Sequence, residues 1–437
     1  MSNTKIFTVI GNPILHSKSP QVFNAAFKAA SIDAVYTRLA ASNAKEAIAI
    51  IKENGIGGFN VTAPFKLDIM PFLDSVDKSA AKIGAVNMVI SRDGKLAGYN
   101  TDFIGVINAL KNNGITPRGK KAVVLGAGGA GRAAAFGLIS FDATDVVIVD
   151  RTSGKAKSAA KQLGCRPAPM EKMSAELPDA DILVSCVSTK ERVINPRLLK
   201  KGLAVLDANY TASRLLADAT GAGCTAISGL EWFLFQAAAA FRLFTGGKAP
   251  LKIMKKALDS TIQADSKSNI ALIGFMGAGK SKVGQILAAK MKMEFEDTDR
   301  SVELSAALTV SEIFKLKGQK EFRKIEKSVI KRMESARGKV FSCGGGAILD
   351  RENRAIISRN CIPVWLWVSP KTALRRISNT VRPLLDVKNS EREAKRILRD
   401  RNHLYAQVAD MMVSTETNSP QESAERIDYE IRNAFKG

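Results

Sequence analysis

The sequence predicts an α/β protein with parallel sheets, because strand-like and helix-like segments alternate along its 437 residues. Two glycine loops support this fold class. GAGGAGR (residues 126–132) follows the apolar run 122–125, and GFMGAGKS (residues 274–281) follows the apolar run 270–273. In such loops glycines let the backbone approach a phosphate, and the next helix offers unpaired N–H donors. One loop is typical of dinucleotide binding and the other of triphosphate binding, which predicts two enzymes in series.

Length and composition set the class of protein. A chain of 437 residues favours two to three domains. Apolar content of 46% and charged content of 24% are ordinary for a globular protein. No apolar run is long enough to span a bilayer and the start lacks a signal peptide, so we expect a cytoplasmic protein. The five scattered cysteines and two histidines favour reduced thiols over a zinc site.

The formal charge of +23 indicates attraction for anionic ligands, such as a dinucleotide, a triphosphate and a carboxylate substrate. A basic nucleic-acid-binding scaffold is the rival interpretation. The Lys and Arg residues are dispersed through both halves and few aromatic residues lie among them, so we expect small-molecule partners, with no nucleic acid and no membrane. The oligomeric state is left open.

The predicted elements of the first half follow apolar runs bounded by turn residues. We expect strands at residues 5–10, 56–61, 182–185 and 204–207, and helices at residues 20–30, 103–112, 231–244 and 251–262. Residues 120–150 form a strand, a glycine turn, a helix and a second strand at residues 145–149. The polar stretch 264–269 then predicts a linker before the strand at residues 270–273.

The spacing of Gly126, Gly128 and Gly131 is typical of a Rossmann dinucleotide-binding turn. Polar residues also follow predicted strands elsewhere in the first half. These residues are Ser17 and Ser19 in the loop 11–20, Thr62 and Lys66 in the segment 58–66, and Asp102 in the segment 98–103. A Lys and an Asp at strand ends can make an acid–base pair at a hydroxyl or carbonyl group. Taken singly, each is more simply a surface charge or a helix cap.

Taken together, these segments resemble shikimate dehydrogenase. GNPILHSKSP, GFNVTAPFK, IGAVN, GYNTDFIG, GAGGAGRA and GLEWFLFQAAAAFRLFTG occur in order over residues 1 to 262. The resemblance implies reduction of 3-dehydroshikimate to shikimate, with quinate as an open alternative substrate, and Lys66 and Asp102 as the catalytic pair. It implies substrate contacts from Ser17, Ser19, Thr62, Asn87, Tyr210 and Gln236. It implies cofactor contacts from Gly126, Gly128, Gly129, Gly131, Asp150, Arg151, Thr152 and Gly229.

The cofactor choice depends on residues 150–152. Relatives of this kind commonly have Asn-Arg-Thr there, with the Arg on the 2′-phosphate of NADP, whereas this chain has Asp150-Arg151-Thr152. An acid at this position usually accepts hydrogen bonds from an unphosphorylated ribose, while Arg151 and Lys155 favour the phosphate. We predict NADP and leave NAD open.

The second loop, G-x-x-x-x-G-K-S, is shared by many nucleotide-binding families. In it Lys280 reaches the β/γ oxygens of ATP and Ser281 binds magnesium. Five further segments narrow the choice of family, because together with the loop they resemble shikimate kinase from about residue 269 onward. They are FEDTD (295–299), EFR (321–323), SCGGG (342–346), RPLL (382–385) and RNHLY (401–405). The predicted fold is a P-loop α/β domain like that of nucleoside monophosphate kinases.

This resemblance implies phosphorylation of the shikimate 3-hydroxyl by ATP and magnesium. The implied catalytic residues are Asp299 on the attacking hydroxyl, Lys280, and Arg382 on a lid. Substrate contacts come from Arg323, Arg401, Gly344, Gly345 and Gly346, and nucleotide contacts from Gly277, Gly279, Lys280 and Ser281. Asp297 joins Ser281 at the metal. Arg375 or Arg376 is a further ATP contact, and the spacing does not choose between them.

The two resemblances predict a bifunctional shikimate-pathway enzyme. We expect a substrate-binding domain at residues 1–106 to which residues 240–262 return, a Rossmann domain at residues 107–239, a linker at residues 263–269 and a kinase domain at residues 270–437. The alternative is a dehydrogenase whose kinase-like half binds a ligand and regulates without catalysis. The six polar residues that the kinase chemistry needs argue against it: Lys280, Ser281, Asp299, Arg323, Arg382 and Arg401.

Overall fold

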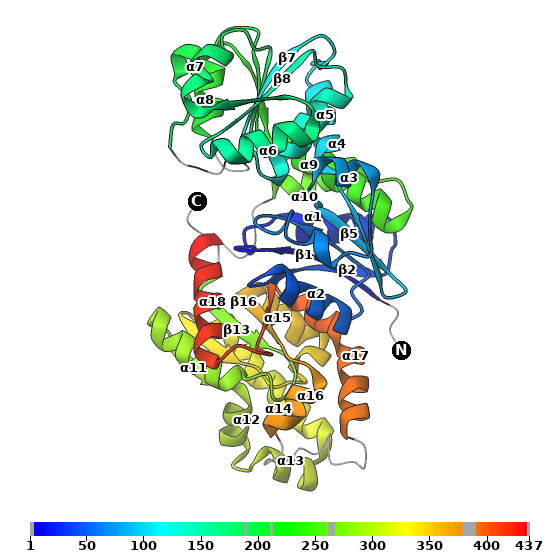
Figure 1. The fold of residues 1–437 in the computed structure, drawn as a ribbon. Helices are drawn as coiled ribbons and strands as arrows, with labels where there is room; N and C mark the ends of the chain where they lie inside the picture. Colours follow the sequence, from blue (N-terminus) through cyan, green and yellow to red (C-terminus); the bar gives the residue numbers. More distant parts are fainter. Residues whose placement is uncertain are drawn as a thin grey trace. The chain divides into compact units, whose positions relative to one another are not determined.

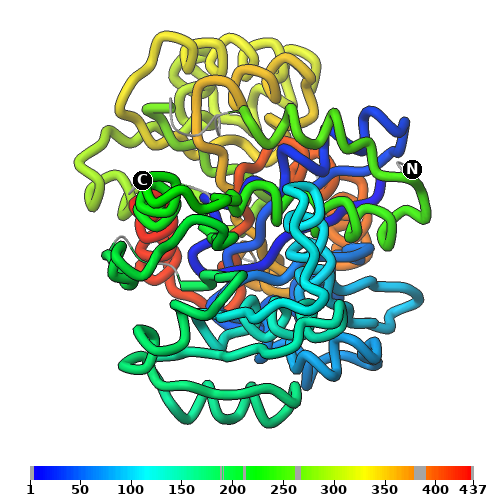
Figure 2. Tube along the Cα trace, turned by 90° about the horizontal axis from the view of Figure 1, so that it is seen from above, coloured from blue at the N-terminus to red at the C-terminus, as the bar shows by residue number. Residues whose placement is uncertain are grey.

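The computed structural model describes residues 4–187, 189, 191–209, 213–260, 267–377 and 390–434. The chain divides into two compact units, one of residues 1–57 with 260–437 and one of residues 58–259. The first unit therefore combines both ends of the sequence. In Figure 2 residues 1–57 are drawn in blue, and residues 260–437 run from green through yellow and orange to red.

The sheet of the first unit is parallel throughout its described pairings, in the order β14-β15-β13-β16-β17-β2-β1. Its strands are β1 (Lys5–Gly11), β2 (Ala34–Ala40), β13 (Asn269–Ile273), β14 (Glu294–Asp297), β15 (Lys339–Ser342), β16 (Cys361–Trp367) and β17 (Met411–Ser414). Strand β17 pairs with β2, with Met412 opposite Leu39 and Val413 opposite Ala40. One sheet thus joins the N-terminal strands to those of the second half of the sequence.

The central strands of this sheet are buried along their whole length. Every residue of β13 (NIALI) and of β16 (CIPVWLW) is buried, as expected of parallel strands covered by helices on both faces. Figure 1 shows α11 and α18 side by side next to these strands. The helices are α1 (Ser19–Ala29), α2 (Ala44–Glu53), α11 (Lys280–Met291), α12 (Thr298–Ala306), α13 (Val310–Leu316), α14 (Gly318–Lys331), α15 (Arg351–Asn360), α16 (Pro370–Ile377), α17 (Ser390–Val408) and α18 (Pro420–Ala434).

The second unit contains a parallel sheet in the order β12-β11-β10-β7-β8-β9. Its strands are β7 (Lys121–Leu125), β8 (Asp145–Asp150), β9 (Arg166–Pro169), β10 (Ile182–Ser185), β11 (Ala204–Asp207) and β12 (Thr225–Ser228). Helices α5 (Gly129–Ser140), α6 (Ser153–Leu163), α7 (Met173–Glu176) and α8 (Arg214–Gly221) surround it (Figure 1). Alternate residues of β7 enter two separate apolar clusters, which places a core on each face of the sheet.

The rest of the second unit carries the strands β3 (Gly58–Val61), β5 (Met88–Arg92), β6 (Lys95–Tyr99) and β4 (Ser75–Val76), in that order. Strands β5 and β6 form an antiparallel hairpin, and β5 is also antiparallel to β3. The helices here are α3 (Lys78–Ile83), α4 (Asp102–Asn112), α9 (Gly229–Thr245) and α10 (Leu251–Asp259). Helix α4 packs on α9 and on α5.

The predicted α/β class is confirmed, and so are the strands at residues 182–185 and 204–207. Two predicted strand starts differ: the strand expected from residue 56 begins at Gly58, and the strand expected from residue 270 begins at Asn269. Asn269 is fully buried and donates to the carbonyl oxygens of Ala336 and Asn360, which explains a polar residue in a strand. Of the predicted linker at residues 263–269, residues 263–266 lie outside the described parts of the chain. Within those parts, no helix is both long and apolar enough to cross a membrane.

Candidate active sites

An ion pair in the second unit joins two of the predicted catalytic residues. Lys66 lies beyond β3, and Asp102 is the first residue of α4. Lys66 Nζ donates to Asp102 Oδ2 at 2.5 Å, and both side chains are mostly buried. The backbone N–H of Asp102 donates to Asn100 Oδ1, which fixes the start of the helix. This arrangement can hold an ammonium donor at a fixed point for proton transfer.

A cluster of amide and hydroxyl groups comes together in the same unit. Asn87 Nδ2 lies 3.0 Å from Thr101 Oγ1 and 3.3 Å from Gln236 Oε1. Asn87 Oδ1 accepts from the backbone N–H of Thr101 at 2.7 Å. The fold thus unites two predicted substrate residues that are 149 positions apart, and adds Thr101, which the sequence did not single out. Thr62 lies directly after β3, and Tyr210 lies outside the described residues.

Ser17 and Ser19 belong to the first unit, where they meet at the start of α1. Ser17 Oγ lies 3.2 Å from Ser19 Oγ, and both residues are buried. The guanidinium of Arg38 donates to the carbonyl oxygen of Ser17 through Nε at 2.9 Å and Nη2 at 2.6 Å. The position of this loop is therefore fixed by a buried side chain of the neighbouring strand β2.

The dinucleotide loop lies between β7 and α5, as predicted. Gly126 has a φ of 108°, and a Cβ atom on Gly131 would collide with the carbonyl oxygen of Gly126. A Cβ atom on Gly129 would lie 2.9 Å from Cβ of Lys66, so the glycine lets Lys66 pack against the first turn of α5. The loop therefore meets the ion pair, and the N-terminus of α5 is suited to bind an anionic dinucleotide.

Asp150, at the end of β8, bonds to backbone groups of the cofactor region. Its Oδ2 accepts from the N–H of Ala127 at 2.8 Å, and its Oδ1 accepts from the N–H of Thr152 at 2.8 Å. Arg151 and Thr152 are exposed. Gly229 begins α9, and a Cβ atom there would lie 2.6 Å from the carbonyl group of Ala208. The carboxylate therefore ties the glycine loop to the end of β8, a role that the sequence pattern did not reveal.

A cavity of about 530 Å³ in the first unit brings the predicted kinase residues together. Its lining includes Lys280, Ser281, Asp297, Asp299, Arg323, Gly344, Gly345, Gly346, Arg376 and Arg401. Lys280 Nζ donates to the carbonyl oxygens of Gly274 and Phe275 at 3.0 and 2.9 Å. Gly277 and Gly279 have φ values of 76° and 82°, in the left-handed region that favours glycine. The loop therefore has the backbone that a phosphate-binding turn needs.

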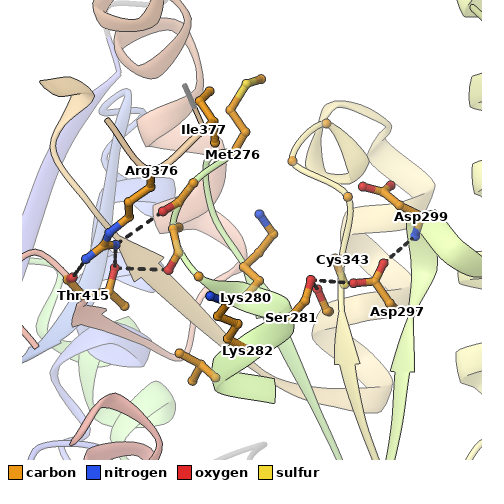
Figure 3. Close-up of a pocket in the computed structure, with 18 of the residues that line it drawn as sticks. Met276, Lys280, Ser281, Lys282, Asp297, Asp299, Cys343, Arg376, Ile377 and Thr415 are labelled. Carbon is orange, nitrogen blue, oxygen red and sulfur yellow. Dashed lines mark hydrogen bonds between the residues drawn. The ribbon is translucent and has the colours of Figure 1, made fainter. Parts of the chain in front are cut away.

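Ser281 and Asp297 line this cavity and point toward each other (Figure 3). Ser281 Oγ lies 2.6 Å from Asp297 Oδ2 and 3.3 Å from Ser342 Oγ. Hydroxyl and carboxylate oxygens are the ligands that magnesium prefers, so these residues fit that ion. On the other side of the loop, Arg376 donates to the carbonyl oxygen of Gly277 at 3.3 Å. Of the two neighbouring arginines, Arg376 is the one that lines the cavity.

The lining of the cavity also includes Asp299, Arg323 and the three glycines 344–346. Arg323 Nη1 donates to Glu326 Oε2 at 2.6 Å. Burial raises the pKa of Glu326 above its usual value, although Arg323 opposes the shift. A Cβ atom on Gly344 would lie 2.5 Å from Asp299 Oδ1, and one on Gly346 would collide with the Arg323 guanidinium. These glycines thus leave room for the charged groups of the site.

Two residues of this site were missed in the sequence. Glu326 lies three positions after Arg323 on α14, and Tyr405 lies four positions after Arg401 on α17. The hydroxyl of Tyr405 donates to the carbonyl oxygen of Gly345 at 2.7 Å, and Arg401 Nη1 donates to the same oxygen at 3.2 Å. Helical spacing from a predicted arginine was the signal that could have found both. Arg382 lies outside the described residues.

The fold and the two sites define a dinucleotide-dependent oxidoreductase joined to a P-loop kinase. Family models for the shikimate dehydrogenase substrate binding domain, for shikimate/quinate 5-dehydrogenase and for the shikimate 5′-dehydrogenase C-terminal domain match residues 9–89, 109–218 and 229–258. The model for shikimate kinase matches residues 276–432.

Individual relatives agree with these models. The NADP(+) shikimate dehydrogenase of Moorella thermoacetica is 38% identical over 283 residues, which cover 61% of this chain and 96% of the relative. The structure of shikimate dehydrogenase from Aquifex aeolicus matches with 34% identity and a TM-score of 0.56, over 60% of this chain and 100% of that one. The Thermus thermophilus enzyme in complex with NADP(H) and shikimate matches with 32% identity and a TM-score of 0.54, over 58% of this chain and 98% of that one. The chain belongs to the shikimate dehydrogenase family and carries a shikimate kinase domain after it, which makes it a bifunctional shikimate-pathway enzyme.

Proposed function

We propose that the chain reduces 3-dehydroshikimate to shikimate with NADPH and then phosphorylates shikimate to shikimate 3-phosphate with ATP and magnesium. The observation that carries the proposal is the presence of two phosphate-binding turns, each next to polar residues that its proposed reaction would use. The names of the relatives support the substrates and NADP. The direction of the first reaction is part of the proposal.

In the first reaction, bound NADPH supplies a hydride to the carbonyl carbon of the substrate. Lys66 donates a proton to the carbonyl oxygen as it becomes a hydroxyl, and Asp102 orients the ammonium and that oxygen. Because Lys66 packs against Gly129, the proton donor lies at the loop that we propose binds the cofactor. In the oxidative direction, Lys66 would accept the proton from the substrate hydroxyl.

We propose that the hydroxyl and amide groups predicted from the resemblance recognise the ring of the substrate. They are Ser17, Ser19, Thr62, Asn87, Tyr210 and Gln236. Each can donate and accept, which suits a ring with several hydroxyl groups. The hydrogen bonds between Asn87, Thr101 and Gln236 hold these groups in fixed orientations before the substrate arrives.

In the second reaction, magnesium-bound ATP supplies the phosphoryl group. Ser281 and Asp297 would hold the metal, and Lys280 with the backbone N–H groups after Gly277 and Gly279 would hold the phosphates. Asp299 would orient the attacking 3-hydroxyl and accept its proton. Arg323 and Arg401 would bind the substrate carboxylate, and Arg382 would stabilise the charge on the transferred group.

The proposal also covers the domains, the partners and the location of the protein. We propose a substrate-binding domain at residues 1–106 with 240–262, a Rossmann domain at residues 107–239, a linker at residues 263–269 and a kinase domain at residues 270–437. The partners are small anionic substrates, without nucleic acid or membrane, and the enzyme works in the cytoplasm. Arg151 favours NADP as the cofactor, whereas the charge of Asp150 leaves use of NAD open.

Two separate assays of the full chain test the function. NADPH oxidation should depend on 3-dehydroshikimate, and ADP release should depend on shikimate and magnesium. A dehydrogenase with a non-catalytic kinase-like half would give the first signal without the second. Quinate with NADP and dehydroshikimate with NADH are the comparison reactions that define the substrate and the cofactor. A chain that turns over neither proposed substrate would contradict the proposal.

A further inference from the structure

One helix of the kinase part (the proposed kinase domain, residues 270–437) extends from the cavity lined by the triphosphate loop to the loop that carries Ser17 and Ser19. At its N-terminal end, Pro420 and Ser423 of α18 line the cavity. Near its C-terminal end, Glu430 contacts the segment just before Ser17. Figure 1 shows α18 (red) beside α11, the helix that follows the triphosphate loop.

The contact made by Glu430 is buried and directed at the backbone. Glu430 Oε2 accepts from the N–H of Ile14 at 2.7 Å and from the N–H of Leu15 at 3.0 Å. The residues Glu430, Ile14 and Leu15 are all 0% exposed. A buried carboxylate is costly unless it is hydrogen-bonded, and backbone donors to a carboxylate are among the stronger partners. The contact therefore fixes two consecutive peptide groups of the loop.

A second buried contact holds the same loop to the kinase part. The Arg38 guanidinium donates through Nε and Nη2 to the carbonyl oxygen of Ser17, and through Nη1 to the carbonyl oxygen of Asp410 at 2.9 Å. Asp410 precedes β17, which pairs with β2, the strand that contains Arg38. The side chain of Asp410 also pairs with Lys267 at 2.8 Å. The loop is thus held at both Ile14 and Ser17 by groups tied to the second half of the sequence.

We propose that the kinase part completes the substrate-binding loop of the dehydrogenase, and that Glu430 is a positioning residue for binding of 3-dehydroshikimate. Glu430 does not touch the substrate in this proposal: it orients the peptide groups of Ile14 and Leu15 and, through them, the hydroxyls of Ser17 and Ser19. The inference rests on the proposed substrate role of those two serines. An interface that served packing alone would not need an acid on two loop N–H groups.

The test compares full-length variants in both assays. In E430A the two loop N–H groups lose their acceptor, so we expect the KM for 3-dehydroshikimate to rise about tenfold, with kcat and the KM for NADPH within about twofold. The kinase kcat and KM values should stay within about twofold of those of the parent protein. E430Q keeps a carbonyl oxygen that can accept both bonds, and it should restore most of the affinity. E425A, which removes an exposed acid from the same helix, is the matched control.

The outcomes separate this inference from the proposed function. An unchanged KM in E430A, or an equal loss of both activities, overturns the inference. If E430A does not fold, R38K decides the matter: it weakens the paired contact to Ser17, and a KM for 3-dehydroshikimate equal to that of the parent protein overturns the inference. S17A tests the proposed role of the loop itself. A KM unaffected by S17A would remove that role, whereas an S17A effect without an E430A effect would remove only the inference about Glu430.

Discussion

Nζ of Lys66 lies 2.5 Å from Oδ2 of Asp102, and the two side chains are only 16% and 7% exposed. The two residues come from different elements, the segment after β3 and the first turn of α4. Gly129 of the dinucleotide loop packs against Lys66. A shielded ion pair at the cofactor loop is the feature that a proton-transfer site for a dehydrogenase needs.

Removing the ammonium group should slow the first reaction and leave the second unchanged. K66M keeps the aliphatic length of Lys66 but cannot donate a proton, so we expect the dehydrogenase kcat to fall about 10²- to 10⁴-fold. The kinase kcat should not change. The matched control is K82M, which alters an exposed lysine of α3 and should leave both rates near those of the parent protein. A dehydrogenase kcat within a few-fold of the parent value in K66M would remove Lys66 from the chemistry.

The carboxylate of Asp299 should be needed only for phosphorylation. D299N preserves the shape of the side chain but cannot accept the proton of the attacking hydroxyl, so we expect the kinase kcat to fall about 10²- to 10⁴-fold. Coupled ADP release measures this rate, and NADPH oxidation serves as the internal reference. E334Q, at an exposed position of the same unit, is the control. Equal losses of both activities in D299N would indicate damage to the fold instead.

Asp150 should bias the cofactor choice through its charge. In D150N the negative charge near the predicted 2′-phosphate position is lost, so we expect the ratio of kcat/KM with NADPH to kcat/KM with NADH to rise about fivefold, which corresponds to about 1 kcal/mol. The kcat/KM values with NADPH and with NADH should both decrease. In D150N an NH₂ group replaces one of the two carboxylate oxygens that accept from the N–H groups of Ala127 and Thr152. D142N, at an exposed turn, is the control. A ratio that stays the same or falls would contradict the role assigned to Asp150.

Glu326 should make stability depend on pH. Burial raises its pKa above the usual 4.5, so the folded protein holds this proton more tightly than the unfolded chain does. The stability that this adds is present below about pH 4.5 and is lost as the pH rises through the folded pKa. E326Q does not titrate there, so its urea midpoint minus that of the parent protein should become more positive between about pH 4 and pH 7. E321Q, at a more exposed position on α14, is the control variant. A flat or falling difference for E326Q would contradict the expectation.

Much of the fold could be predicted because it is encoded locally. Apolar runs followed by glycine turns located β7 and β13 to within about one residue, and the helix expected after the first glycine turn is α5. The pairing of β17 with β2 could not be predicted, because it joins residues 39–40 to residues 412–413 and no local signal encodes a partner so distant in sequence. The division of the chain into two compact units could not be predicted for the same reason, because the first 57 residues form one unit with the distant residues 260–437.

Site residues that belong to a sequence motif were predicted. Site residues whose role depends only on contacts in the folded chain were missed. Lys66 with Asp102 and Ser281 with Asp297 were expected from their motifs, and the structure brings each pair together. Glu430 was not expected, because its partners are the backbone N–H groups of Ile14 and Leu15, which have no sequence signature. Backbone partners likewise hid the second role of Asp150.

The central claim is that one polypeptide makes shikimate and then phosphorylates it. Its most direct test incubates the full chain with 3-dehydroshikimate, NADPH, ATP and magnesium and measures the masses of the products. Over a time in which the parent protein converts its substrate to shikimate phosphate, we expect mainly shikimate from D299N and very little of either product from K66M. Formation of shikimate without its phosphate by the parent protein would contradict the account.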